Sequence, residues 1–126
     1  MKILHIALAC GSEEKADRFY ADLLGLEKQD PKIVPAEVSR AIFGLASELK
    51  VINYTGELVR FEMFIDASLP GDHRRIDHVC LEVENLELFL QKCRSADVNI
   101  IQTPKGGSLV TFIRDFDNNL FEIKEI

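Results

Sequence analysis

Residues 4–8 read LHIAL and residues 77–81 read DHVCL, so a strand-like pattern with histidine in second place occurs once in each half of the chain. After each copy comes a residue that can cap a helix, Ser12 or Asn85, followed by an amphipathic helical pattern. Each helical pattern leads into further strand-like segments. The order strand, helix, strands therefore occurs twice, which indicates an internal duplication.

The remaining elements can be predicted from hydrophobic period and turn residues. Residues 3–10 predict the first strand, and Gly25 is expected to end the first helix. A short second helix is expected over residues 35–45, with Pro35 at its start. The other expected elements are a hairpin over 50–65, a linker over 66–75, a strand over 98–102, a loop over 103–108 and a hairpin over 108–125.

Length and composition limit the class of protein. The chain has 126 residues, 47% hydrophobic and 29% charged, which favours one domain over residues 1–126, with modules at about 1–68 and 74–126. A net charge of −6 and a pI near 5.0 argue against nucleic-acid and membrane partners. The three cysteines lack CxxC spacing, and the N-terminus shows no signal-peptide pattern. We therefore expect a reduced, cytoplasmic protein.

Four strands each carry one residue that can bind a metal. Residues two apart in a strand share a face, and in each of these strands one face is wholly apolar while the other carries a histidine or a glutamate. One such residue alone is more often structural or solvated, but its recurrence in all four strands favours a common site. Two imidazoles and two carboxylates suit a divalent transition metal such as Zn, Ni, Co, Fe or Mn. The candidate ligands are His5, Glu62, His78 and Glu122.

The spacing of these residues agrees with the duplication. The stretch from His5 to Glu62 is longer than the stretch from His78 to Glu122. The short helix expected over residues 35–45 falls in the longer stretch and accounts for about the whole difference. Without that helix, the two His–Glu pairs would occupy matching places in the two halves.

Three further polar residues bear on the candidate site. Arg60 and Lys124 share the face of the candidate ligands and are candidates for binding an anionic substrate, although each could equally pair with Glu82 or lie at the rim. His73 falls in the expected linker and is interpreted as an exposed loop residue.

The segments HIAL, FYADLLGL, FEMF, DHVCLEV and RDFDNNLFEI resemble the vicinal oxygen chelate superfamily, also called the glyoxalase, bleomycin resistance and extradiol dioxygenase family. The resemblance covers nearly the whole chain. It implies an α+β fold of two tandem βαβββ modules, whose mixed sheets curl around a metal cleft. It also implies a homodimer and metal ligands on the first and last strands of each module, at His5, Glu62, His78 and Glu122.

The resemblance also implies a type of reaction. Within this family, two histidines and two glutamates form the ligand set of glyoxalase I, in which a ligand glutamate moves a proton between adjacent carbons of a glutathione hemithioacetal. Glu122 or Glu62 would be that base. Ala9 and Asp66, however, stand where glyoxalase I has an arginine and an asparagine that hold glutathione.

We therefore expect a metal-dependent, glyoxalase-like lyase or isomerase that acts on another small α-hydroxycarbonyl or carboxylate compound through an enediolate-type intermediate. Two alternatives stay open. One is a resistance protein that binds an antibiotic without chemistry, a class that generally lacks a full ligand set. The other is an enzyme similar to methylmalonyl-CoA epimerase, whose features after the glycine loop are poorly matched here.

Overall fold

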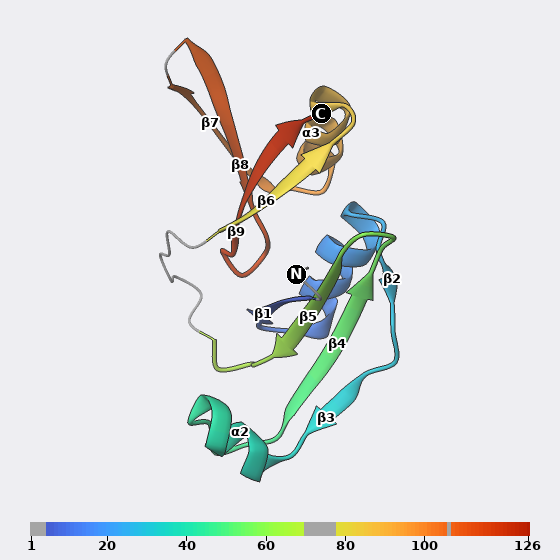
Figure 1. Cartoon of the computed structure of the whole chain (residues 1–126), viewed down its shortest axis with the longest axis vertical. Helices are drawn as coiled ribbons and strands as arrows, with labels where there is room; N and C mark the ends of the chain where they lie inside the picture. The colour runs from blue at the N-terminus through green and yellow to red at the C-terminus, as the bar shows by residue number, and fades with distance from the viewer. Residues whose placement is uncertain (1–4, 70–77, 106) are drawn as a thin grey trace. The chain divides into compact units, whose positions relative to one another are not determined.

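The chain is divided into two compact units, Met1–Leu69 and Pro70–Ile126. The structure is a computed structural model, and it describes residues 5–69, 78–105 and 107–126. Each unit contains one mixed β-sheet and a helix between its first two strands (Figure 1). The predicted α+β class, built from two mixed sheets, is therefore confirmed.

The first unit has a five-stranded sheet in the order β1-β5-β4-β2, with β3 also paired to β4. Strand β1 runs parallel to β5, whereas β4 and β5 form an antiparallel hairpin. The strands are β1 (Ile6–Cys10), β2 (Glu27–Lys28), β3 (Lys32–Val34), β4 (Leu49–Thr55) and β5 (Arg60–Ile65).

The first helix has the expected ends and an unexpected interior. Ser12 caps α1 (Glu13–Ala16), since its side chain accepts a hydrogen bond from the Lys15 amide at 3.2 Å. The chain continues as a π-helix, η1 (Asp17–Leu23), and Gly25 ends it with φ +70°. Leu26 N–H then donates to the Tyr20 carbonyl at 3.0 Å, which satisfies a carbonyl group of the last helical turn.

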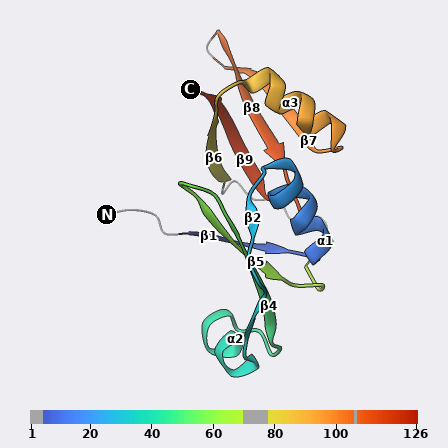
Figure 2. The same ribbon diagram turned by 90° about the vertical axis from the view of Figure 1, so that its right-hand side faces the viewer.

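This helix covers one face of the first sheet (Figure 2). Phe19 and Tyr20 are fully buried there, and the Tyr20 ring lies 5.2 Å from the Phe61 ring and 5.6 Å from the Tyr54 ring. Because side chains alternate along β5, burial of Phe61 and Met63 under the helix places Glu62 on the opposite face. Tyr54 is fully buried in the same core.

The second unit has a four-stranded sheet in the order β6-β9-β8-β7. Asn85 caps its helix by accepting a hydrogen bond from the Leu88 amide at 2.9 Å, as expected. Leu90, Cys93, Ile113 and Phe121 are buried between helix and sheet. The elements are β6 (His78–Val83), α3 (Leu86–Ser95), β7 (Asn99–Lys105), β8 (Ser108–Arg114) and β9 (Leu120–Glu125).

The two sheets repeat one pattern. In both, the first strand pairs in parallel with the last, and the last pairs antiparallel with the strand before it. The main difference is the connection between the two strands that precede the last one. In the first unit it runs from the end of β3 at Val34 to Leu49, whereas in the second it only joins Lys105 to Ser108. The longer connection contains α2 (Ala36–Phe43), the short helix predicted after Pro35.

Several boundaries differ from the sequence predictions. Strand β1 begins at Ile6, so His5 precedes it, and residues 1–4 lie outside the described residues. The predicted loop over 103–108 was wrong, because β7 continues to Lys105 and β8 starts at Ser108. Strand β7 lies at the edge of its sheet, where Pro104 can be accommodated without a ladder hydrogen bond. The short strands β2 and β3 were not predicted.

Candidate metal centre

His5 and Glu62 lie together in the first unit. His5 Nε2 is 3.4 Å from Glu62 Oε2, and the side chains are 42% and 25% exposed. In the parallel β1–β5 ladder, Glu62 stands opposite Ala7, two residues after His5 and therefore on the same face. The helix covers the other face, which leaves this pair open to a ligand.

His78 and Glu122 form the corresponding pair in the second unit. His78 Nε2 is 3.9 Å from Glu122 Oε2, with side chains 40% and 19% exposed. Glu122 stands opposite Cys80 in the parallel β6–β9 ladder, again two residues after the histidine. The two units thus place histidine and glutamate in the same register, and the structure brings each predicted pair together within its own unit.

The residues around the pairs make the two half-sites chemically different. Lys124 Nζ lies 3.5 Å from Glu122 Oε1, so an ammonium group accompanies the carboxylate of the second unit. Desolvation, together with the carboxylate of Glu122, raises the pKa of the Cys80 thiol. The described residues include no ion-pair partner of Arg60, which is exposed two positions before Glu62. His73 lies outside the described residues.

Two residues of this face were missed from the sequence. Asn53 stands opposite Glu62 in the β4–β5 ladder, and Phe112 stands opposite Glu122 in the β8–β9 ladder. The Phe112 ring packs edge-on against the His78 imidazole, with centroids 5.3 Å apart. Correct pairing of the two hairpins would have revealed both positions, because directly opposed residues share a face.

The donor atoms fit a divalent transition metal ion. Two ligand atoms held by one tetrahedral ion at about 2.0–2.1 Å lie about 3.3–3.4 Å apart, close to the His5–Glu62 separation of 3.4 Å. The His78–Glu122 distance of 3.9 Å requires only a small side-chain rotation. Among the described residues, no three or more His, Cys, Asp or Glu side chains cluster closely enough to hold a metal ion. Each unit therefore offers only the two donor side chains of its His–Glu pair.

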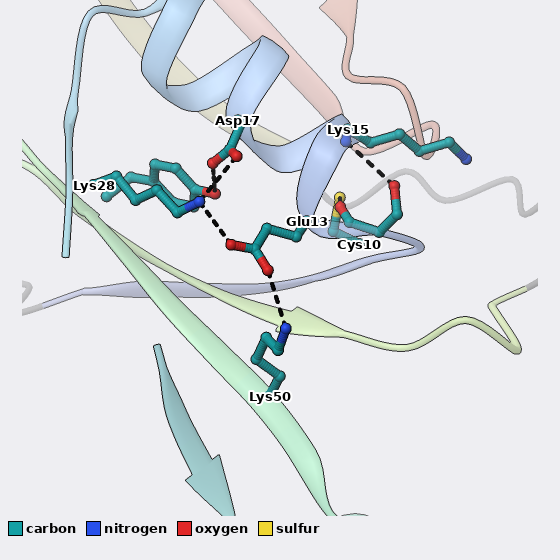
Figure 3. A network of polar contacts seen from close by, with 8 residues as sticks. Cys10, Glu13, Lys15, Asp17, Lys28 and Lys50 are labelled. Atoms are coloured by element: carbon teal, nitrogen blue, oxygen red, sulfur yellow. Dashed lines mark hydrogen bonds and ion pairs between the residues drawn. The ribbon is translucent and has the colours of Figure 1, made fainter. Parts of the chain in front are cut away.

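The most extensive charged network of the first unit lies on the helix side of its sheet and serves the fold (Figure 3). Glu13 accepts hydrogen bonds from Lys28 at 2.7 Å and Lys50 at 3.0 Å, and these lower its pKa. Asp17 accepts from the Tyr54 hydroxyl at 2.7 Å, and burial of that hydroxyl raises the pKa of Tyr54 far above its usual value. These contacts join the helix to β2 and β4.

Comparison with known proteins identifies the family. Residues 2–123 match the model of the Glyoxalase/Bleomycin resistance protein/Dioxygenase superfamily, and the chain belongs to this family. The predicted resemblance is thereby confirmed. A search among curated proteins found no match. Within the part of the chain that the structure describes, no helix is long and apolar enough to span a membrane.

Solved structures of the same fold cover nearly the whole chain. A glyoxalase family protein from Enterococcus faecalis is 18% identical, with a TM-score of 0.71 over 97% of this chain and 95% of that one. The fosfomycin resistance protein FosX from Listeria monocytogenes is 15% identical, with a TM-score of 0.73 over 100% and 93%. A mutant of that FosX was solved with Mn(II) and 1S,2S-dihydroxypropylphosphonic acid; it is 18% identical, with a TM-score of 0.71 over 96% and 89%.

Proposed function

We propose that the protein is a metal-dependent, glyoxalase-like lyase or isomerase acting on a small α-hydroxycarbonyl or carboxylate compound. The observation that carries this proposal is the repetition of one His–Glu pair, in one register and on the open face of both sheets. His5, Glu62, His78 and Glu122 would hold the ion. A divalent ion bound there supplies positive charge, which lowers the free energy of an enediolate.

The two glutamates are the candidates for the base that moves the proton. Lys124 lies beside one oxygen of Glu122, which favours a fixed carboxylate. Glu62 contacts His5 and, among the described residues, no lysine or arginine, so it is freer to turn between two carbon atoms. We therefore assign the proton transfer to Glu62 in the first place, with Glu122 as the alternative, and Arg60 and Lys124 to the anionic part of the substrate.

Metal content tests the site directly. Elemental analysis of purified wild-type protein, before and after reconstitution with Mn(II), Zn(II), Ni(II), Co(II) or Fe(II), should find a stoichiometric ion. His5→Ala and His78→Ala should lose it, whereas His73→Ala, the matched change at the one remaining histidine of the sequence, should retain it. Absence of any bound ion in wild-type protein after reconstitution would remove the enzyme proposal.

Proton exchange tests the reaction even while its product is unidentified. A panel of small α-hydroxycarbonyl and α-hydroxycarboxylate compounds is incubated with metal-loaded protein in D2O and followed by NMR. The proposed proton transfer requires deuterium to enter at the carbon beside the carbonyl. Metal binding without exchange in any compound would favour a binding or resistance protein instead.

A phosphonate is the second candidate ligand, because Lys124 and Arg60 provide positive charge on the same faces as the proposed ligands. A FosX relative was solved with Mn(II) and a dihydroxypropylphosphonic acid, and this compound therefore belongs in the binding panel. Saturable binding of the phosphonate without proton exchange in any carbonyl compound would favour this alternative.

We further propose a cytoplasmic homodimer, as the family resemblance implies. Sedimentation analysis measures its mass, and mixing His5→Ala with His78→Ala protein tests how the half-sites combine. If the ion joins the first unit of one protomer to the second unit of its partner, hybrid dimers regain one intact site. If both half-sites come from one chain, mixing restores no metal.

A further inference from the structure

We propose that Asn53 binds an oxygen of the substrate beside Glu62 and so helps to determine which ligands the site accepts. This inference rests on the proposed function, because it concerns the ligand of the same site. Asn53 is the residue of β4 directly opposite Glu62, and the two side chains share the open face of the sheet. The Cβ atoms of directly opposed residues in an antiparallel pair lie about 4.5–5.5 Å apart, so a group touching Glu62 can also reach the Asn53 amide.

The Asn53 amide has hydrogen-bonding capacity that the described part of the protein does not use. Its Oδ1 is buried and has no hydrogen-bond partner among the described residues. A buried polar atom without a partner costs about 1–3 kcal/mol, so native proteins seldom keep one without a purpose. The terminal torsion of asparagine is soft, so the amide can turn and donate a hydrogen bond to an oxygen that arrives at the open face.

The residues beside Glu62 on the same face are also suited to such a ligand. On the other side of Glu62, β1 presents Ala7, which is exposed and carries only a methyl group. Arg60 lies on the same face, two residues before Glu62 in β5 and opposite Thr55. Small residues beside the carboxylate, together with an amide and a guanidinium, make this unit suited to an oxygen-rich, anionic ligand.

The second unit carries a different kind of residue at the same position. Phe112 occupies the place of Asn53, opposite Glu122, and packs its ring against the His78 imidazole. An aromatic ring there fixes the histidine and offers no hydrogen bond. The duplicated fold therefore accepts an apolar residue at this position, and the amide in the first unit is not required by the fold.

The test compares ligand affinity with stability. Asn53→Val suits a strand and removes the amide, and Asn53→Ala serves as a second variant should valine prevent folding. The probe is acetohydroxamate, whose two adjacent oxygens imitate an enediolate, titrated calorimetrically into Mn(II)-loaded protein. We expect an unchanged Mn(II) content, an unchanged or higher urea midpoint for the metal-free Asn53→Val protein, and a dissociation constant for the probe about tenfold higher, as for loss of one hydrogen bond to a charged group.

Thr111→Val is the matched control, because Thr111 is a buried strand residue of the second unit whose hydroxyl accepts a hydrogen bond from Gln102 at 3.1 Å. It should lower the urea midpoint and leave probe affinity unchanged. If wild-type protein binds both Mn(II) and the probe, and both Asn53 variants bind the probe within twofold of wild type, the inference is wrong while the proposed function stands. If wild-type protein binds neither, both fail together.

Discussion

Glu62 and Glu122 occupy the same position in the two units but have different neighbours. Lys124 accompanies Glu122, and Asn53 stands opposite Glu62. Equal positions in a duplicated fold can therefore serve different roles, one carboxylate holding the ion and the other also moving a proton. The difference arises from the residues one strand away, which the ligand motifs alone do not include.

The glutamine variants should separate these roles. Glu62→Gln keeps an oxygen donor but cannot accept a proton, so we expect it to retain most of the metal and to lose deuterium exchange by a factor of about 100 or more, the usual contribution of a general base. Glu122→Gln also keeps an oxygen donor, so it should retain most of the metal and, because Glu122 is assigned only to holding the ion, most of the exchange. Elemental analysis and NMR exchange rates of the two variants measure both effects. The reverse pattern would assign the proton transfer to Glu122.

Cys80 provides a reporter of occupancy. Cys80 is exposed, whereas Cys10 and Cys93 are buried. It follows His78 by two residues in β6 and stands opposite Glu122 in the β6–β9 ladder. An ion held by His78 and Glu122 should shield the thiol, so we expect alkylation by iodoacetamide to slow several-fold on saturation with Mn(II). Mass spectrometry of the labelled peptide measures the rate, and His78→Ala protein provides the control. Equal rates with and without metal would place the ion away from the second half-site.

The turn between β8 and β9 sets the start of the strand that carries Glu122. Asp115 is 5% exposed, and its carboxylate accepts the backbone N–H groups of Asp117 and Asn119 at 2.9 and 2.8 Å. Asn118 adopts φ +67°, a left-handed conformation that asparagine tolerates in turns. Asp115→Ala should lower the free energy of unfolding by about 1–3 kcal/mol, because one buried and one partly buried N–H group lose their acceptor.

Urea unfolding measures this loss, and Asp30→Ala, at an exposed loop position, is the control. The control should stay within about 0.5 kcal/mol of wild type, as most surface changes do. An equal effect of both variants would mean that the Asp115 carboxylate contributes nothing specific to the turn.

The ion pairs that join the first helix to its sheet should make stability depend on acidity. Hydrogen bonds from Lys28 and then Lys50 hold the pKa of Glu13 below its usual value of 4.5. Since the folded protein then binds fewer protons than the unfolded chain, the stabilisation is present above about pH 4.5 and is lost as the pH falls. Glu13→Gln should cost about 0.5 kcal/mol at pH 7, given solvent screening, and less at pH 3, where more of the Glu13 carboxyl is protonated.

Urea midpoints at both pH values measure this difference. Glu14→Gln makes the same charge change one residue later, at an exposed position without an ion pair among the described residues, and should have no such effect. A cost of Glu13→Gln that stays constant with pH would show that its charge is not the cause.

The internal duplication made most of the fold predictable from the sequence. Helix caps at Ser12 and Asn85, the stop at Gly25 and the alternation of β5 and β9 all follow from local chemistry, and the structure agrees with them. The π-helix and the splitting of one edge strand into β2 and β3 depend on packing across the unit. No local pattern records such packing, which is why these features were missed.

The candidate site could be predicted only in part, for a related reason. The alternation of each strand identifies the face of a histidine or glutamate, and both predicted pairs do lie together. The neighbours Asn53 and Phe112 depend on hairpin register, which in turn depends on turn length. The turn after Thr55 and the turn after Arg114 are both longer than a two-residue hairpin loop, so no simple rule predicts their pairing from the sequence.

The proposed four-ligand centre would need both units, and in that case the histidines should show non-additive losses. Each half-site offers two donors, too few for a tight transition-metal site, which usually takes three or four protein ligands. His5→Ala or His78→Ala alone should therefore weaken Mn(II) binding by more than about a hundredfold, beyond the 10- to 100-fold typical of residues that only orient ligands. The double variant should be little worse, because groups that act as a unit fail together.

Competition with a fluorescent chelator measures these affinities, and His73→Ala again controls for the loss of a histidine as such. Thermal unfolding of each metal-free variant verifies that both units remain folded. If each single variant instead loses one of two bound ions and binds the other with unchanged affinity, each unit binds its own ion. The shared four-ligand centre would then be excluded.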